Sequence, residues 1–134
     1  MKFKKPKSQY YNVIIAEDNP EHQKLIKKLI EQYNVNIDIV NNGQELLDKL
    51  NYGRTYDIVI MDIQMPVMDG YTATEAIRKN PEFSNLIIIG LTAFAMQGDE
   101  QIALSKGMND YITKPITKQT LHRALSRHLV LKKS

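Results

Sequence analysis

Three carboxylates, one hydroxyl and one amine occur at the ends of short, largely apolar segments spread along this sequence. They belong to Glu17, Asp18, Asp62, Thr92 and Lys114. Carboxylates brought close together repel one another, and the pKa of at least one rises unless a cation intervenes. A divalent cation with oxygen ligands is the natural partner. Mg²⁺ fits because it binds through one or two carboxylates, keeps several waters and accepts phosphate oxygens. Mn²⁺ is an alternative with the same kind of ligands.

The expected ligands follow from this chemistry. We expect Asp18 and Asp62 to bind the metal directly and Glu17 to act through a water molecule. A backbone carbonyl near Gln64, just after Asp62, would complete the protein ligands.

The same residues suit a phosphoryl group. Lys114 is a point charge for one phosphoryl oxygen, and the Thr92 hydroxyl can donate a hydrogen bond to a second. Catalysis of phosphoryl transfer is mostly positioning plus electrostatic stabilisation, which a metal ion and a lysine can supply together. Asp62 would then be the nucleophile and would form an aspartyl phosphate.

The segment 57–62 is the centre of the predicted fold. Its apolar residues lead directly into Asp62, and Pro66 and Gly70 mark a loop after it. A short apolar run bounded by turn residues is typical of a strand that is buried on both faces. Asp62 therefore lies at the carboxyl end of a strand.

Strands and helices alternate along the chain. The pattern predicts strands over 11–16, 35–40, 57–62, 86–91 and 111–113, and helices that start at Pro20 and cover about 45–50, 71–79, 99–105 and 117–129. Strict alternation with short links predicts a doubly wound α/β fold, with a parallel sheet covered by helices on both faces. Ligands bind at the carboxyl ends of the strands in such sheets, so this fold would gather the candidate residues at one edge.

Other residues have structural interpretations. Asp18 or Asn19 can cap the helix that starts at Pro20, and Asp69 is expected to support its turn. Helical spacing predicts that this helix faces the core with Leu25, Ile26, Leu29, Ile30 and Tyr33. The histidines lie on predicted helices without ligand spacing, and we expect them to be solvated: His22, His122 and His128.

Length and composition indicate one domain. The chain has 134 residues, of which 43% are hydrophobic and 25% charged, as in ordinary globular domains. We expect a disordered basic leader over 1–9, one domain over 10–131 and a short tail over 132–134. The absence of cysteine excludes disulfides and thiolate metal sites. No apolar run approaches the length of a membrane helix, so we expect no membrane insertion and a cytoplasmic location.

The net charge of +3 comes from the two ends of the chain. Six lysines lie there, at positions 2, 4, 5, 7, 132 and 133. Without them, 12 basic residues stand against 15 acidic ones, so the body of the chain is acidic. A nucleic-acid-binding face needs Lys and Arg clustered on one surface, and we therefore expect no direct binding of nucleic acid.

Five motifs, in order, give a resemblance to a known family. They are Glu17-Asp18, Asp62, the following Met65-Pro66 with Asp69-Gly70, Leu91-Thr92-Ala93, and Tyr111 with Lys114-Pro115. Each alone has little specificity. Together, with the predicted elements between them, they resemble the receiver domain of two-component response regulators over about residues 11–129. The residues around Met65 and within 95–111 look most like receivers of hybrid sensor histidine kinases or phosphorelays.

The resemblance implies a fold and the roles of the acidic residues. The fold would be flavodoxin-like, with strand order 2-1-3-4-5, and the bond between Lys114 and Pro115 would be cis. Asp62 would be the phosphoacceptor, and Glu17 and Asp18 would form the acidic metal pocket.

The same resemblance implies a switch. Thr92 and Lys114 would sense the phosphoryl group, and the ring of Tyr111 would turn inward as the threonine moves. The readout surface would be the fourth helix, fifth strand and fifth helix. Gln64 and Phe94 would influence how fast water removes the phosphoryl group, and the bulky Phe94 is expected to lengthen the phosphorylated lifetime.

These implications describe a signalling domain rather than an enzyme. We expect metal-assisted self-phosphorylation and slow self-dephosphorylation. The expected partner is a histidine kinase, which can belong to the same parent chain, or a histidine phosphotransfer protein, or both.

Three other functions are open to test. A flavin-binding electron carrier shares the fold class, but Glu17 and Asp18 would repel the flavin phosphate. A haloacid-dehalogenase-type phosphatase also forms an aspartyl phosphate, but it needs a second aspartate where Gln64 stands. The main alternative is a phosphorylation-independent protein-interaction module of the same fold, which labelling with a phosphodonor distinguishes.

Overall fold

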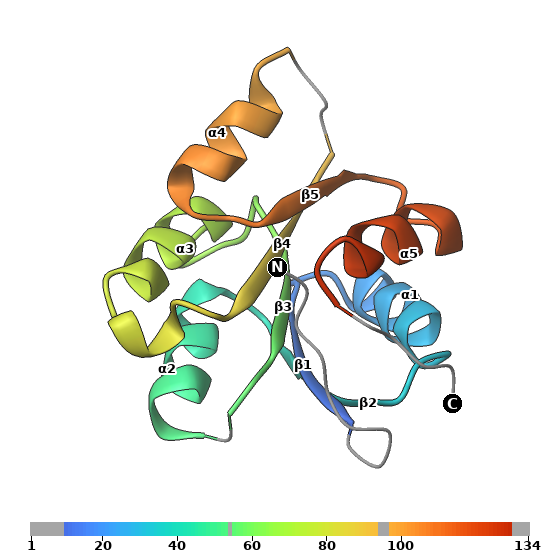
Figure 1. Ribbon diagram of the computed structural model, residues 1–134, viewed down its shortest axis with the longest axis horizontal. Helices are drawn as coiled ribbons and strands as arrows, with labels where there is room; N and C mark the ends of the chain where they lie inside the picture. Colours follow the sequence, from blue (N-terminus) through green and yellow to red (C-terminus); the bar gives the residue numbers. More distant parts are fainter. Residues whose placement is uncertain (1–9, 54, 94–96, 130–134) are drawn as a thin grey trace.

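A five-stranded parallel sheet, covered by helices on both faces, organises the protein (Figure 1). The computed structural model describes residues 10–53, 55–93 and 97–129. The strands are β1 (Tyr11–Ala16), β2 (Val35–Val40), β3 (Ile58–Asp62), β4 (Ile87–Thr92) and β5 (Asp110–Thr113). The helices are α1 (Pro20–Ile30), α2 (Gly43–Tyr52), α3 (Gly70–Arg78), α4 (Asp99–Lys106), α5 (Lys118–Ser126) and the short 3-10 helix η1 (Pro81–Phe83). The order β2-β1-β3-β4-β5, with every neighbouring pair parallel, confirms the predicted flavodoxin-like arrangement.

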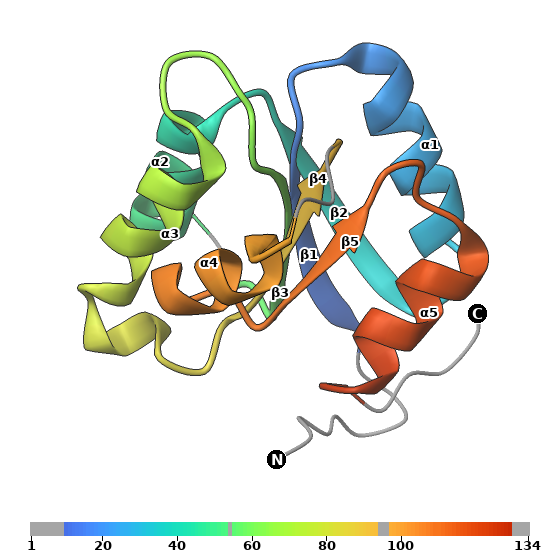
Figure 2. The ribbon, with the colours of Figure 1, turned by 90° about the horizontal axis from the view of Figure 1, so that it is seen from above.

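Helices α1 and α5 cover one face of the sheet, and α2, α3 and α4 cover the other (Figure 2). A hydrophobic core lies on each face of the sheet, and strand β3 contributes side chains to both. Ile58 and Ile60 pack on the α1 and α5 side, whereas Val59 and Met61 pack on the opposite side. Successive side chains of a strand point to opposite faces, so a strand buried on both faces needs an uninterrupted apolar run. This confirms the central strand that the sequence predicts.

Several helix ends differ from the predicted ranges. Helix α2 begins at Gly43 rather than Glu45, because the Asn42 side chain caps it by accepting a hydrogen bond from the Glu45 N–H (2.9 Å). Helix α5 ends at Ser126, earlier than predicted, although Leu129 beyond it is still buried. The sequence prediction did not include η1.

The predicted core face of α1 is correct except at one residue. Ile26, Ile30 and Tyr33 are buried, and Leu29 packs against the same core. Leu25 is 40% exposed, so its predicted inward position is wrong. A helix packed on a sheet buries a stripe about 100° wide, and Leu25 lies just outside that stripe.

Three predictions concern residues outside the described ranges: the leader over 1–9, the tail over 132–134, and Phe94. Within the described ranges, the helices are too short or too polar for any of them to cross a membrane.

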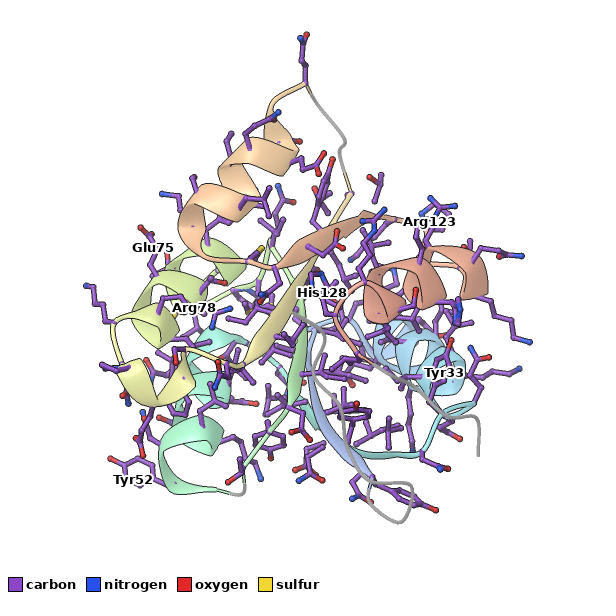
Figure 3. All side chains as sticks on the ribbon, viewed as in Figure 1. Tyr33, Tyr52, Glu75, Arg78, Arg123 and His128 are labelled. Atoms are coloured by element: carbon purple, nitrogen blue, oxygen red, sulfur yellow. The ribbon has the colours of Figure 1, made fainter. Side chains whose placement is uncertain are left out.

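The Arg78 side chain joins four segments on the side of α3 and α4 (Figure 3). Its Nε donates to the carbonyl of Gly107 (2.9 Å), and its Nη1 donates to the carbonyl of Phe83 (2.7 Å). Its Nη2 donates to the carbonyl of Leu86 and to Oδ1 of Asn109, each at 2.8 Å. The guanidinium thus ties the end of α3 to η1, to the start of β4 and to the turn between α4 and β5.

We predict that Arg78→Lys lowers the free energy of unfolding by about 2–4 kcal/mol, because one ammonium cannot reach acceptors arranged around a planar guanidinium. Lys79→Ala, at the exposed neighbouring position, should change it by less than about 0.5 kcal/mol. Urea denaturation measures both values. Equal stabilities for the two variants would contradict the bridging role of Arg78.

Val67, in the loop between β3 and α3, has a backbone φ of 68°. A β-branched residue rarely adopts this left-handed conformation, which costs about 1–2 kcal/mol. The side chain is 82% exposed, so its burial does not offset that cost. The strained residue lies five positions after Asp62, in the loop that leaves the candidate site.

We predict that Val67→Asn raises the free energy of unfolding by about 1 kcal/mol, because asparagine tolerates the left-handed region. Val67→Thr keeps the branch at Cβ and is the matched control, which should leave stability unchanged. Thermal and urea denaturation provide the comparison. An asparagine variant no more stable than the threonine variant would mean that this loop stores no backbone strain.

Candidate functional site

The predicted residues meet at one edge of the sheet. Glu17 directly follows β1, Asp62 ends β3, Thr92 ends β4 and Lys114 directly follows β5. Lys114 Nζ lies 3.1 Å from Glu17 Oε1 and 3.1 Å from Asp62 Oδ2. Residues 97 and 52 positions apart in the sequence thus form one ion-paired group, because parallel strands end at the same edge.

This ion-paired group is largely removed from water. The side chain of Glu17 is 0% exposed, that of Asp62 10% and that of Lys114 19%. Burial raises the pKa of Glu17, and the nearby charge of Asp62 acts in the same direction. A hydrogen bond from the Asn19 N–H and the ammonium of Lys114 oppose that rise.

The positive charge of Lys114 compensates the negative charges of Glu17 and Asp62. Burial alone would lower the pKa of Lys114, but hydrogen bonds and charges from Asp62 and Glu17 outweigh it, so the pKa is raised. Lys114 therefore carries its positive charge at neutral pH.

The acidic residues fit a hard divalent cation. Glu17, Asp18 and Asp62 each offer a carboxylate oxygen, and these oxygens lie within 4.8 Å of one another. An all-oxygen set with two acids sheltered from water matches the ligands that Mg²⁺ prefers. The Gln64 N–H donates to Asp62 Oδ1 (3.3 Å), and the predicted use of the Gln64 carbonyl as a ligand stays a prediction.

The turn between β1 and α1 leaves Asp18 available for a metal. Asn19, not Asp18, caps α1: its Oδ1 accepts hydrogen bonds from the N–H groups of Glu21 (2.9 Å) and His22 (3.2 Å). The Asn19 N–H in turn donates to Glu17 Oε2 (3.0 Å). Because a cap satisfies the free N–H groups of the first turn, Asp18 is not needed for that purpose.

The loop after β3 folds back tightly against Asp62. The Gly70 N–H donates to the Ile63 carbonyl (2.8 Å). A Cβ atom on Gly70 would lie 2.6 Å from the Asp62 carbonyl oxygen, so only glycine fits this approach. Asp69 caps α3 by accepting a hydrogen bond from the Thr72 N–H (2.8 Å), which confirms its predicted support of the turn.

Thr92 and Tyr111 lie on neighbouring strands beside this group. The backbone carbonyl of Thr92 accepts a hydrogen bond from the Lys114 N–H (2.7 Å). Tyr111 is partly buried and packs against the core on the side of α2, α3 and α4. The peptide bond between Lys114 and Pro115 is cis, as predicted. The switch roles of Thr92 and Tyr111 stay predictions.

His22 is a contributor that the sequence interpretation missed. Its side chain is 46% exposed, in agreement with the prediction that it is solvated. Its Nδ1 nevertheless lies 3.2 Å from Lys114 Nζ and 3.5 Å from Glu17 Oε1, contacts that the prediction did not include. The signal was its place in the first turn of α1. That turn follows β1 directly and must therefore lie at the same edge of the sheet as Glu17.

The other two histidines also have partners. His122 Nδ1 lies 2.8 Å from the hydroxyl of Tyr33, and the two rings stack with centroids 6.1 Å apart. His128 Nε2 lies 3.3 Å from Asp110 Oδ2, and the side chain is 22% exposed. Figure 3 places Tyr33 beside α1 and His128 near α5. His122 is exposed, as predicted, whereas His128 is only partly exposed, so the prediction of a solvated side chain is wrong for His128.

The response regulator receiver domain family matches residues 13–126 of the chain. Among curated proteins, the chain is 40% identical over 123 residues to the hybrid signal transduction histidine kinase I of Dictyostelium discoideum. That alignment covers 87% of this chain and 7% of the relative. The chain thus spans a small part of the length of the curated relatives that it matches.

Solved structures with a similar fold and at least 30% identity include the following two. The receiver domain of sensor histidine kinase PA1611 from Pseudomonas aeruginosa PAO1, with a magnesium ion coordinated in its active site cleft, has a TM-score of 0.79 and 35% identity, covering 89% of this chain and 97% of that chain. The Saccharomyces cerevisiae co-crystal structure of the histidine phosphotransfer signalling protein Ypd1 and the receiver domain of its downstream response regulator Ssk1 matches with a TM-score of 0.79 and 30% identity, covering 87% of each chain.

The family match begins within β1 and ends at the last residue of α5. It therefore includes every strand whose end contributes to the ion-paired group, together with all the helices that cover the sheet. Because sequence motifs, strand order and this match agree over the same residues, the chain belongs to the response regulator receiver domain family.

Proposed function

We propose that Asp62 accepts a phosphoryl group from a phosphohistidine and that this modification switches the domain between two signalling states. The observation that carries the proposal is the Lys114 ammonium, 3.1 Å from both Glu17 and Asp62. A cation held against a carboxylate at the strand ends is placed to receive the charge of an incoming phosphoryl oxygen.

The transfer needs no proton from the protein. A carboxylate oxygen of Asp62 forms a bond to phosphorus while the P–N bond of the donor breaks. The bonding electron pair stays on the imidazole nitrogen, and the donor ring, protonated on its other nitrogen, leaves as neutral imidazole. Lys114 neutralises one phosphoryl oxygen, and the Thr92 hydroxyl donates to another. Mg²⁺ held by Asp18 and Asp62, with Glu17 behind them, would neutralise further phosphoryl charge.

The switch uses residues on neighbouring strands. In the phosphorylated state, the Thr92 side chain moves toward the phosphoryl group, and the ring of Tyr111 fills the space that it leaves. A phosphoryl group that contacts one arrangement better shifts the population toward it. The surface of α4, β5 and α5 would report this state to a partner. Gln64 and Phe94 would set how fast water reaches the phosphoryl group.

The donor is a histidine kinase, a histidine phosphotransfer protein, or both. The hybrid-kinase relative supports a kinase in the same parent chain, and the Ypd1 complex supports a phosphotransfer protein. Nucleic acid has no direct part in this proposal, and a cytoplasmic location stays a prediction.

We predict that the chain takes up a phosphoryl group from acetyl phosphate and Mg²⁺, whereas Asp62→Asn takes up none, because an amide cannot act as the nucleophile. Asp69→Asn is the matched control. It makes the same change seven residues further along, where asparagine still caps α3, and it should be labelled like the wild type. Intact-mass spectrometry gives the readout. Label on Asp62→Asn would mean that the acceptor is another residue, and an unlabelled wild type would favour the interaction module.

We predict that Asp18→Asn abolishes stabilisation by Mg²⁺ without destabilising the metal-free protein, because it removes one charge from a repelling acidic group. At a Mg²⁺ concentration about ten times its dissociation constant, the wild type should gain about 1.4 kcal/mol of unfolding free energy. Urea denaturation with and without MgCl₂ measures this gain. Asp48→Asn, on the exposed side of α2, should keep it. A gain retained by Asp18→Asn would place the metal elsewhere.

A further inference from the structure

The ammonium of Lys114 has three protons and three acceptors. Two acceptors are carboxylate oxygens of Glu17 and Asp62, each 3.1 Å from Nζ. The third is Nδ1 of His22, at 3.2 Å. An ammonium has three donors and no acceptor, so this contact requires Nδ1 to accept and places the ring proton of a neutral histidine on Nε2.

The turn between β1 and α1 fixes where this ring lies. Glu17 Oε2 accepts from the Asn19 N–H (3.0 Å), and the Asn19 side chain caps the His22 N–H (3.2 Å). Glu17, which accepts one proton of Lys114, therefore also fixes the backbone of His22 through its hydrogen bond with Asn19. His22 and Glu17 form a single fixed frame around the lysine.

The three acceptors differ in exposure and in what the reaction does to them. The side chain of His22 is 46% exposed, whereas the two other partners of the lysine, Glu17 and Asp62, are 0% and 10% exposed. Phosphorylation turns the Asp62 carboxylate into an acyl phosphate and weakens it as an acceptor, while new phosphoryl oxygens appear beside it. The bonds to Glu17 and His22 need not change.

We propose that His22 is a positioning residue for Lys114: its Nδ1 and Glu17 hold two protons of the ammonium and thereby aim the third at the oxygen of Asp62 or of its phosphoryl group. The inference rests on the proposed function. Without His22, one proton of Lys114 is donated to water instead, and Nζ is freer to move outward. Small displacements of a group that stabilises charge slow a reaction.

The test compares two substitutions at His22 in the whole chain. His22→Leu removes the acceptor, whereas His22→Asn offers Oδ1 close to the position of Nδ1. The measurement is the initial rate of phosphorylation by acetyl phosphate at saturating Mg²⁺, followed by intact-mass spectrometry. His122→Leu makes the same change at the histidine that pairs with Tyr33, outside the site, and serves as control.

We expect His22→Leu to react about three- to tenfold more slowly, as the loss of one hydrogen bond implies, with unchanged affinity for Mg²⁺. His22→Asn and His122→Leu should react at the wild-type rate. A His22→Leu rate equal to the wild type, or a His22→Asn rate as slow as that of His22→Leu, would overturn the positioning role. An unlabelled wild type would instead contradict the proposed function itself.

A second measurement does not depend on the reaction. In ¹⁵N NMR of the metal-free chain, His22 should carry its proton on Nε2, and Lys114→Met should shift the Nδ1 resonance because its donor is gone. A ring protonated on Nδ1, or a resonance that Lys114→Met leaves in place, would contradict the hydrogen bond on which the inference depends.

Discussion

The hydrogen-bonded ion pairs of Lys114 with Glu17 and Asp62 are the constraint on which the rest of this structure depends. A carboxylate as buried as Glu17 is costly unless it is paired and hydrogen-bonded. The lysine supplies that compensation only because β1, β3 and β5 run parallel and end at one edge of the sheet. The covering helices and the apolar strands hold these strand ends in register, and this keeps the charged side chains of Lys114, Glu17 and Asp62 close together.

Much of this fold could be predicted because its signals are local. The apolar run of β3 is long enough to indicate a strand buried on both faces, and β-α alternation then indicates a parallel sheet. Helix ends were less predictable, since they depend on which side chain reaches back to cap the first turn, as Asn42 does for α2. Leu25 shows a further limit: apolar spacing finds the buried stripe of a helix but not its border.

In the candidate site, too, some residues could be predicted from the sequence and others could not. Glu17, Asp62 and Lys114 could be brought together from the sequence, because each follows a predicted strand. The contact of His22 was missed, since its partner is 92 positions away and only its place in the first turn of α1 indicated that it lies at the same edge of the sheet. The choice of Asn19 over Asp18 as the cap was also open in the sequence. The structure resolves it through hydrogen bonds from the first turn of α1.

A crystal structure of the chain with Mg²⁺ and beryllofluoride, a mimic of the phosphoryl group, tests the central claim most directly. The account predicts beryllofluoride on Asp62, the metal ion on Asp18 and Asp62, and Lys114 Nζ within hydrogen-bonding distance of a fluoride. Beryllofluoride bound at another residue, or a Lys114 that points away from it into solvent, would contradict the account.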